Sequence, residues 1–270
     1  MDSVRRGSIC KTCFMVCLLA LLSEGVWADD LPNAPSAQEN RLSSYDPAAM
    51  YLRPVRPAHE AKSAFQWKAA GTQTLALLAM EQSFRMLQKK TRDQLGGRFF
   101  PDWFACVENL HGWSDGDSLW TNYIGHPIHS SWAGYIEIQN DPAGRNLQFE
   151  NSERYWMSRF RALGWAELYE VQWHLGPISE ASIGHVGRRP THTLGYVNIV
   201  SSAPGGLGLI VLQDWLDKHV VEPREARTRS LNRRRLYRML FNPSRAVTNL
   251  FRGKKPWYRD YRPIGWVGSE

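Results

Sequence analysis

The residues best suited to acid–base or metal chemistry lie in two segments, 122–141 (NYIGHPIHSSWAGYIEIQND) and 176–187 (GPISEASIGHVG). The first segment contains Asn122, His126 and Glu137, and the second contains Glu180. Buried His and Glu side chains have displaced pKa values and can exchange protons with a substrate. The sequence therefore offers His126 and Glu180 as a general acid–base pair. Glu137 is the alternative carboxylate, and Asn122 is a candidate binding residue.

The same residue types could also bind a metal ion. His126 and His129 are three residues apart, which places both on one face of a helix. Glu170 and His174 are four apart in a later segment, so a cavity between helices could hold His and carboxylate ligands. However, no HExxH motif is present, and no ExxH occurs in either expected helix. We therefore predict structural hydrogen bonding here rather than a metal site, and the sequence assigns no cofactor.

Two common kinds of catalytic site lack their motifs. No Gly-x-Ser-x-Gly occurs, so a serine hydrolase has no support from the sequence. The Gly-rich stretch 205–208 (GGLG) lacks the Lys-Ser/Thr of a phosphate-binding loop. Small residues in this pattern favour close helix packing instead.

Helical periodicity dominates the segments that would position these residues. The hydrophobic spacing and the capping signals predict five helices. Residues 194–200 and 134–138 could alternatively form strands, but regular alternation is absent elsewhere. We predict an all-α fold, a compact bundle of about five helices whose 12 Trp residues suit membrane association. The five expected helices are 64–92, 101–111, a helix within 118–140, 151–174 and 205–219.

Pro127 interrupts the segment that carries both His126 and His129. A proline removes a backbone donor and clashes with the preceding turn, and the residue before it avoids helical angles. We expect the helix either to begin at Pro127, with His126 at its cap, or to kink there. Asn122 and His126 would then brace the start of this helix, with Glu180 as a partner.

The N-terminal region predicts export. Residues 1–28 combine Arg5, Arg6 and Lys11 with a short apolar run and the small-x-Ala end Val26-Trp27-Ala28, which is typical of a Sec signal peptide. We expect a periplasmic location or the periplasmic face of a membrane, which includes the outer membrane. Residues 29–62 are Pro-rich and predict a disordered tail. The helical domain is expected at 63–221.

Residues 222–270 form a basic and aromatic C-terminal extension. Between Arg224 and Arg262 there are 13 Lys and Arg but two acids, a net charge of +11 against +7 for the whole chain. Basic and aromatic residues together suit an anionic membrane lipid or a lipid phosphate. Nucleic acid has the same charge signature but is not an expected partner of an exported protein. The candidate lipid-binding residues are Arg233, Arg234, Arg235, Lys254, Lys255 and Trp257.

Three motifs together resemble a group of uncharacterised exported bacterial proteins of acidobacterial type. They are DGDSLWTNYIGHPIHSSWAGYIEIQNDP, GPISEASIGHVG and NPSRAVTNLFRGKKPWYRD. The Asn-x-x-x-His-Pro core, followed by an acidic helix and a Gly-rich helix, is also similar to the domain of unknown function DUF3943. The resemblance covers most of residues 99–260. It implies a fold and an envelope location, and no established activity comes with it.

Two hypotheses on function follow. The first is a non-enzymatic, envelope-associated helical protein with a structural or lipid-interacting role, held to anionic lipid by its C-terminal extension. The second is an envelope enzyme that acts on lipid or glycan through a His/Glu acid–base or metal site. The sequence favours the first, because it shows no complete catalytic set.

Overall fold

The computed structural model describes residues 64–188 and 193–264, and all of them lie in one compact unit, residues 53–270. The predicted signal peptide (1–28) and the Pro-rich tail (29–62) lie outside the described residues. The described part is an all-α bundle, as the sequence predicted. Its elements are α3 (Trp67–Met86), α4 (Lys89–Arg92), α5 (Phe99–Glu108), the π-helix η1 (Thr121–Gly125), α6 (His126–Asn140), α7 (Glu153–Leu175), α8 (Tyr196–Leu216), the π-helix η2 (Asp217–Val221), α9 (Glu222–Arg227), α10 (Leu231–Phe241) and α11 (Pro243–Phe251).

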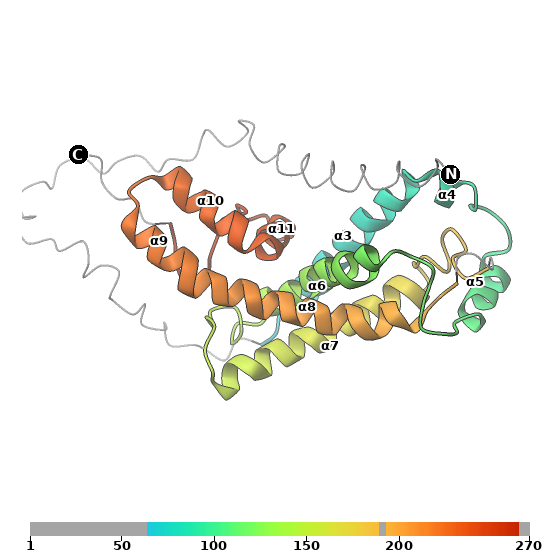
Figure 1. Cartoon of the computed structure of the whole chain (residues 1–270), viewed down its shortest axis with the longest axis horizontal. Helices are drawn as coiled ribbons and strands as arrows, with labels where there is room; N and C mark the ends of the chain where they lie inside the picture. The colour runs from blue at the N-terminus through green and yellow to red at the C-terminus, as the bar shows by residue number, and fades with distance from the viewer. Residues whose placement is uncertain (1–63, 189–192, 265–270) are drawn as a thin grey trace, which may run out of the picture. The chain divides into compact units, whose positions relative to one another are not determined.

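Three long helices form the centre of the bundle. Helix α6 packs against both α7 and α8, which also pack against each other and run antiparallel (Figure 1). Helices α3 and α11 contact α6 as well, so α6 is enclosed. From Ser130 to Asn140 nearly every residue of α6 is buried. The chemistry-bearing residues on α6 are therefore held between helices rather than presented on a surface.

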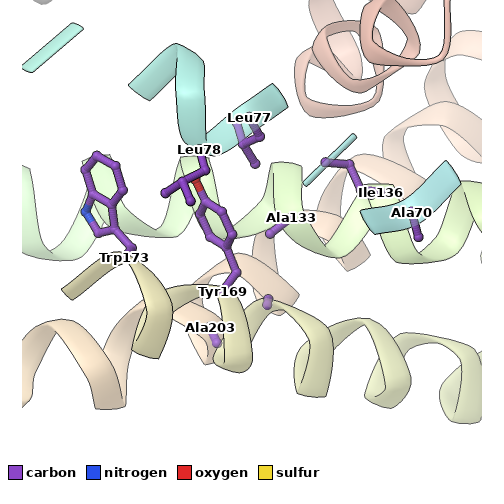
Figure 2. Close-up of a cluster of buried hydrophobic side chains, with 9 residues drawn as sticks. Ala70, Leu77, Leu78, Ala133, Ile136, Tyr169, Trp173 and Ala203 are labelled. Atoms are coloured by element: carbon purple, nitrogen blue, oxygen red, sulfur yellow. The ribbon is translucent and has the colours of Figure 1, made fainter. Parts of the chain in front are cut away.

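The main hydrophobic cluster lies where α3 crosses α6 and α7. Leu77 and Leu78 of α3 belong to this cluster with Ala133 and Ile136 of α6 and Tyr169 of α7, whose ring points up toward Leu78 (Figure 2). All five side chains are almost fully excluded from solvent. Burying a large apolar side chain stabilises a fold by roughly 1.5–3 kcal/mol. The cluster fixes the mutual positions of the three helices that carry the candidate site.

The strands considered as alternatives at 194–200 and 134–138 are not formed, in agreement with the all-α prediction. Within the described residues no strand is formed, and Leu194 makes one isolated bridge with Leu110. Helix α8 begins at Tyr196 and continues through Pro204, nine residues earlier than the predicted start at 205. A short apolar run that is buried cannot be assigned to strand or helix by periodicity alone.

Two glycines allow α8 to approach α6 closely, which confirms the packing role predicted for this stretch. A Cβ atom on Gly205 would lie 2.7 Å from Cγ of Pro127, and one on Gly206 would lie 2.7 Å from Cβ of Ser130. Gly208 faces open space, and a Cβ atom placed there would have no neighbour within 4 Å. The first two glycines serve helix contact, and the third lies on the outside.

Pro127 neither starts nor stops a helix. The π-helix η1 leads directly into α6, and the backbone angles of Gly125 and His126 are helical. His126 is therefore not a capping residue, and the expected start at Pro127 is wrong. The chain instead makes a π turn immediately before α6, which was not predicted from the sequence. A π turn closes hydrogen bonds from i to i+5, and such turns are frequent at functional sites.

The basic C-terminal segment packs onto the bundle through α10 and α11. Much of its positive charge is used internally. From this segment, Arg245 donates to Asp214 (3.4 Å) and Arg259 donates to Asp217 (2.9 Å). Asp214 also accepts hydrogen bonds from Arg159 of α7 (2.6 Å) and Tyr135 of α6 (3.0 Å). We call this set the Arg/Asp network; its members are Tyr135, Tyr155, Arg159, Asp214, Asp217, Arg245, Arg259, Tyr261 and Arg262.

Candidate functional site

Three helices and one loop bring polar side chains together beside the hydrophobic cluster. The first turn of α6 supplies His126 and His129, and the C-terminal half of α7 supplies Glu170 and His174. Helix α3 adds Glu81, and the loop after α7 adds Glu180. We call these six residues the His/Glu cluster.

Helical spacing explains why the pairs meet. Glu170 and His174 are i,i+4 on α7, and Glu170 Oε2 lies 3.5 Å from His174 Nε2. His126 and His129 are i,i+3 on α6, and His126 Nδ1 lies 2.9 Å from His129 Nε2. The rings of His126 and His174 have centroids 5.1 Å apart, which joins the two helices.

Outer partners hold the cluster in place. His174 Nδ1 lies 2.6 Å from Glu180 Oε1, and the Ser130 hydroxyl donates to Glu170 Oε1. The Tyr169 hydroxyl donates to Glu81 Oε2 at 2.7 Å. Glu81 Oε1 in turn lies 3.5 Å from His129 Nδ1.

The electrostatics of the cluster favour an ionised Glu180. Burial opposes ionisation of this carboxyl group, but the neighbouring His174 outweighs burial and lowers the pKa of Glu180 to about 2. Arg85, which is buried beside the cluster, acts in the same direction. Glu180 is therefore an acceptor at neutral pH, and the Nδ1–H group of His174 donates to it.

Four buried atoms of the cluster have no hydrogen-bond partner. They are Glu81 Oε1, His129 Nδ1, Glu170 Oε2 and His174 Nε2. Buried polar atoms are normally paired, because leaving one unpaired costs about 1–3 kcal/mol. His126, Glu170 and His174 also each offer an atom within 4.8 Å of the others, which is close enough for one metal ion.

The sequence-predicted residues divide between this cluster and other places. His126 and Glu180 belong to the cluster, joined by His174. Asn122 is buried at the entrance to α6, where its Nδ2 donates to Asp115 Oδ1 at 2.8 Å. Asp115 and His126 also lie close together. Asn122 therefore braces the start of α6 through Asp115.

Glu137 does not join the cluster. It lies eleven residues beyond His126 on α6, about 16 Å along the helix at 1.5 Å per residue. Its nearest cation is Arg161, with Nε 3.8 Å from Glu137 Oε1. Burial and the nearby Asp141 raise the pKa of Glu137 to about 7.

The predicted lipid-binding residues differ in exposure. Arg233 and Lys254 are exposed, whereas Arg234 is buried and its Nε donates to the Thr228 carbonyl at 2.8 Å. The Arg235 guanidinium lies 4.8 Å from the ring centroid of Trp257. Lys255 is half-buried.

Sequence reasoning missed Glu81 and Asp115. Glu81 sits in the apolar pattern of α3 without a neighbouring His, and Asp115 lies in a turn. The available signal was the spacing Glu170-x-x-x-His174, which places both side chains on the buried face of α7. No family model, curated protein or solved structure matches the chain.

Proposed function

We propose that this chain is an exported protein of the cell envelope that interacts with membrane lipid through the outer face of α8. The main support is a row of exposed side chains along this face, which we call the α8 stripe. Its residues follow helical spacing, are exposed, and include no charged side chain. They are Tyr196, Val200, Pro204, Gly208, Leu212 and Trp215.

The composition of the stripe suits hydrocarbon better than water. Residues 193–213 contain no Asp, Glu, Lys or Arg. Tyr196 and Trp215 stand at the two ends, and aliphatic or small residues lie between them. The two aromatic residues are nineteen positions apart, about 29 Å along the helix, which is close to the hydrocarbon thickness of a bilayer. Tyr and Trp are enriched at both membrane interfaces.

Two further observations support the proposal. Among the described residues, the helical stretch Tyr196–Arg227 is long and apolar enough, by length and composition alone, to cross a membrane. The segment before α6 adds exposed aromatic and aliphatic side chains beside the start of α8. Trp120 is 78 % exposed and Leu119 is 74 % exposed.

Labelling of the stripe tests the proposal. Gly208→Cys places a thiol in open space on α8, and Asn232→Cys places one on the exposed face of α10. Cys10, Cys13 and Cys17 are replaced by Ser, and the buried Cys106 is kept. Each variant is reconstituted in vesicles and labelled with an environment-sensitive nitrobenzoxadiazole probe.

We expect a blue-shifted emission and quenching by brominated acyl chains at position 208, and neither effect at 232. Equal quenching at both positions would overturn the proposal. So would a probe at 208 that brominated lipid does not quench.

Anionic lipid remains our proposed partner for the C-terminal segment. Arg233 and Lys254 are exposed there, and many other cations of the segment are occupied by internal acids. We expect the chain to float with anionic vesicles more than with neutral ones, and added salt to reduce the difference. The double variant Arg233→Gln, Lys254→Gln should also reduce the difference in flotation between anionic and neutral vesicles. Equal flotation of the unsubstituted chain with both vesicle types would show that anionic lipid is not bound by the C-terminal segment.

A second candidate function is an envelope enzyme that acts on lipid or glycan. The observation that favours it is the convergence of His126, His174 and Glu180 at the start of α6. We expect Glu180→Gln to lower the release of acyl chains or sugars from envelope extracts at least tenfold relative to the unsubstituted chain. Equal release by both chains would remove this candidate.

A further inference from the structure

Two atoms of the His/Glu cluster face each other without a hydrogen bond. His174 turns Nδ1 toward Glu180 and Nε2 toward Glu170. Nε2 lies 3.5 Å from Glu170 Oε2, and neither atom has a hydrogen-bond partner. Glu170 is 0 % exposed and His174 is 1 % exposed, so bulk water does not reach them. A cation between the two atoms, either a proton on Nε2 or a metal ion, would pair both of them.

The outer partners occupy one atom of Glu170 and one of His174, and the other atom of each has no hydrogen-bond partner. Ser130 occupies Glu170 Oε1 and leaves Oε2, and Glu180 occupies His174 Nδ1 and leaves Nε2. Metal-ligating His almost always donates its other ring N–H to a carboxylate or carbonyl, which fixes the tautomer. The contact between His174 and Glu180 has this form. His126 completes the set, with its Nδ1 held by His129 Nε2.

The three carboxylates of the cluster attract cations. Glu81, Glu170 and Glu180 lie in a largely buried space, and Arg85 supplies one fixed positive charge beside them. The carboxylates outweigh the effect of burial and raise the pKa values of His129 and His174. Buried charges are strongly disfavoured unless they are paired or coordinate a metal ion. A metal ion bound here would replace the protons on its His ligands.

We propose that His126, Glu170 and His174 bind one divalent transition-metal ion, with Zn²⁺ as the best match to the donors. Two His and one Glu are a ligand set of catalytic zinc sites, in which water or substrate takes the fourth position. The three atoms lie within 4.8 Å of one another, which is close enough for them to share one metal ion. The site rests on and deepens the second candidate function, which it would supply with a Lewis acid.

Zinc titration of the purified full-length chain tests the site. Glu170→Gln keeps the shape of the side chain and an acceptor for Ser130 while removing the ligand charge. Glu137→Gln is the matched control: it makes the same substitution at a buried carboxylate about 16 Å away along α6. Affinity is measured by competition with a chromophoric chelator, and bound metal is counted by mass spectrometry after dialysis.

We expect one Zn²⁺ per chain, at least a 100-fold loss of affinity in Glu170→Gln, and a change of less than threefold in Glu137→Gln. Circular dichroism establishes folding of each variant. If Glu170→Gln does not fold, the half-buried His126→Asn gives the same comparison. The proposal is overturned by absence of Zn²⁺ binding, or by equal affinity in the ligand variant and the unsubstituted chain. The second result would indicate adventitious binding by exposed His residues. Neither result bears on the labelling of α8, so the metal site and the lipid contact can fail separately.

Discussion

The His/Glu cluster and the Arg/Asp network both bury charged groups in the same helical bundle, but they complete their hydrogen bonds differently. In the Arg/Asp network both carboxylate oxygens of Asp214 and of Asp217 accept hydrogen bonds, and the unpaired buried atoms belong to the arginines, such as Arg245 Nε. In the His/Glu cluster, Glu170 Oε2 and His174 Nε2 face each other, and neither has a hydrogen-bond partner. Burial of charge is common to both regions, so it does not identify a site. The cluster differs because its unpaired atoms are possible metal ligands and lie close together.

The largest effect is expected where the Arg/Asp network loses its central charge. Asp214→Asn leaves Arg159 and Arg245 buried without their shared counter-charge. Removing one partner of a buried ion pair costs about 3–5 kcal/mol. We expect the free energy of unfolding in urea to fall by that amount. Asp93→Asn, which breaks an exposed pair with Lys89, should cost less than about 1 kcal/mol. Similar losses in the two variants would contradict a structural role for the network.

A smaller effect is expected from Glu180→Gln, the outer partner of His174. The Gln oxygen can still accept from Nδ1, but the charge is lost. Loss of such an outer partner lowers metal affinity by roughly 10–100-fold. We expect this decrease in Zn²⁺ affinity, together with a loss of stability in the metal-free chain, because the variant leaves His174 and Arg85 without the negative charge of Glu180. An unchanged affinity would show that Glu180 does not orient the ring.

The smallest effect is expected at Glu137. As in Glu81 and Glu170, one buried carboxylate oxygen of Glu137, Oε2, has no hydrogen-bond partner, but no His lies beside it. Its pKa of about 7 lies above the ordinary value of 4.5, so the folded state holds its proton longer than the unfolded state. The folded state therefore loses stability as pH rises from about 4.5 to 7. We expect Glu137→Gln to raise the free energy of unfolding by about 1–2 kcal/mol at pH 8 and to have little effect at pH 4.5. Equal changes at both pH values would contradict the shifted pKa.

The fold class could be predicted from the sequence because helical spacing and caps are local signals. Ser152 caps α7, accepting from the Tyr155 amide at 3.2 Å. The start of α8 could not be predicted, because a proline usually marks the first turn of a helix. Pro204 instead lies inside α8, on its exposed side. The sequence predicts only a basic extension for the C-terminal helices, because their acidic partners, Asp214 and Asp217, lie earlier in the chain.

The candidate site was predicted in part. His126 and Glu180 are members of the cluster, but the residue that joins them is His174, from another helix. Glu81 comes from α3, 45 residues before His126 in the chain. No local pattern relates residues that meet only through tertiary packing. Glu137 shares a segment with His126, which made it a candidate, yet helical rise separates the two along α6.

The π turn at Thr121–Gly125 gives the chain one place where its length can change without a change of helical phase. It holds one residue more than an α turn, so deleting an exposed residue such as Tyr123 or Ile124 would convert it to regular α-helix. The residues on either side would keep nearly the same rotation around the axis, because the lost residue is the extra one of the π turn. The same deletion inside α6 would rotate everything before it by about 100°, since 3.6 residues complete a turn. A single-codon deletion in the π turn should therefore be better tolerated than one inside α6.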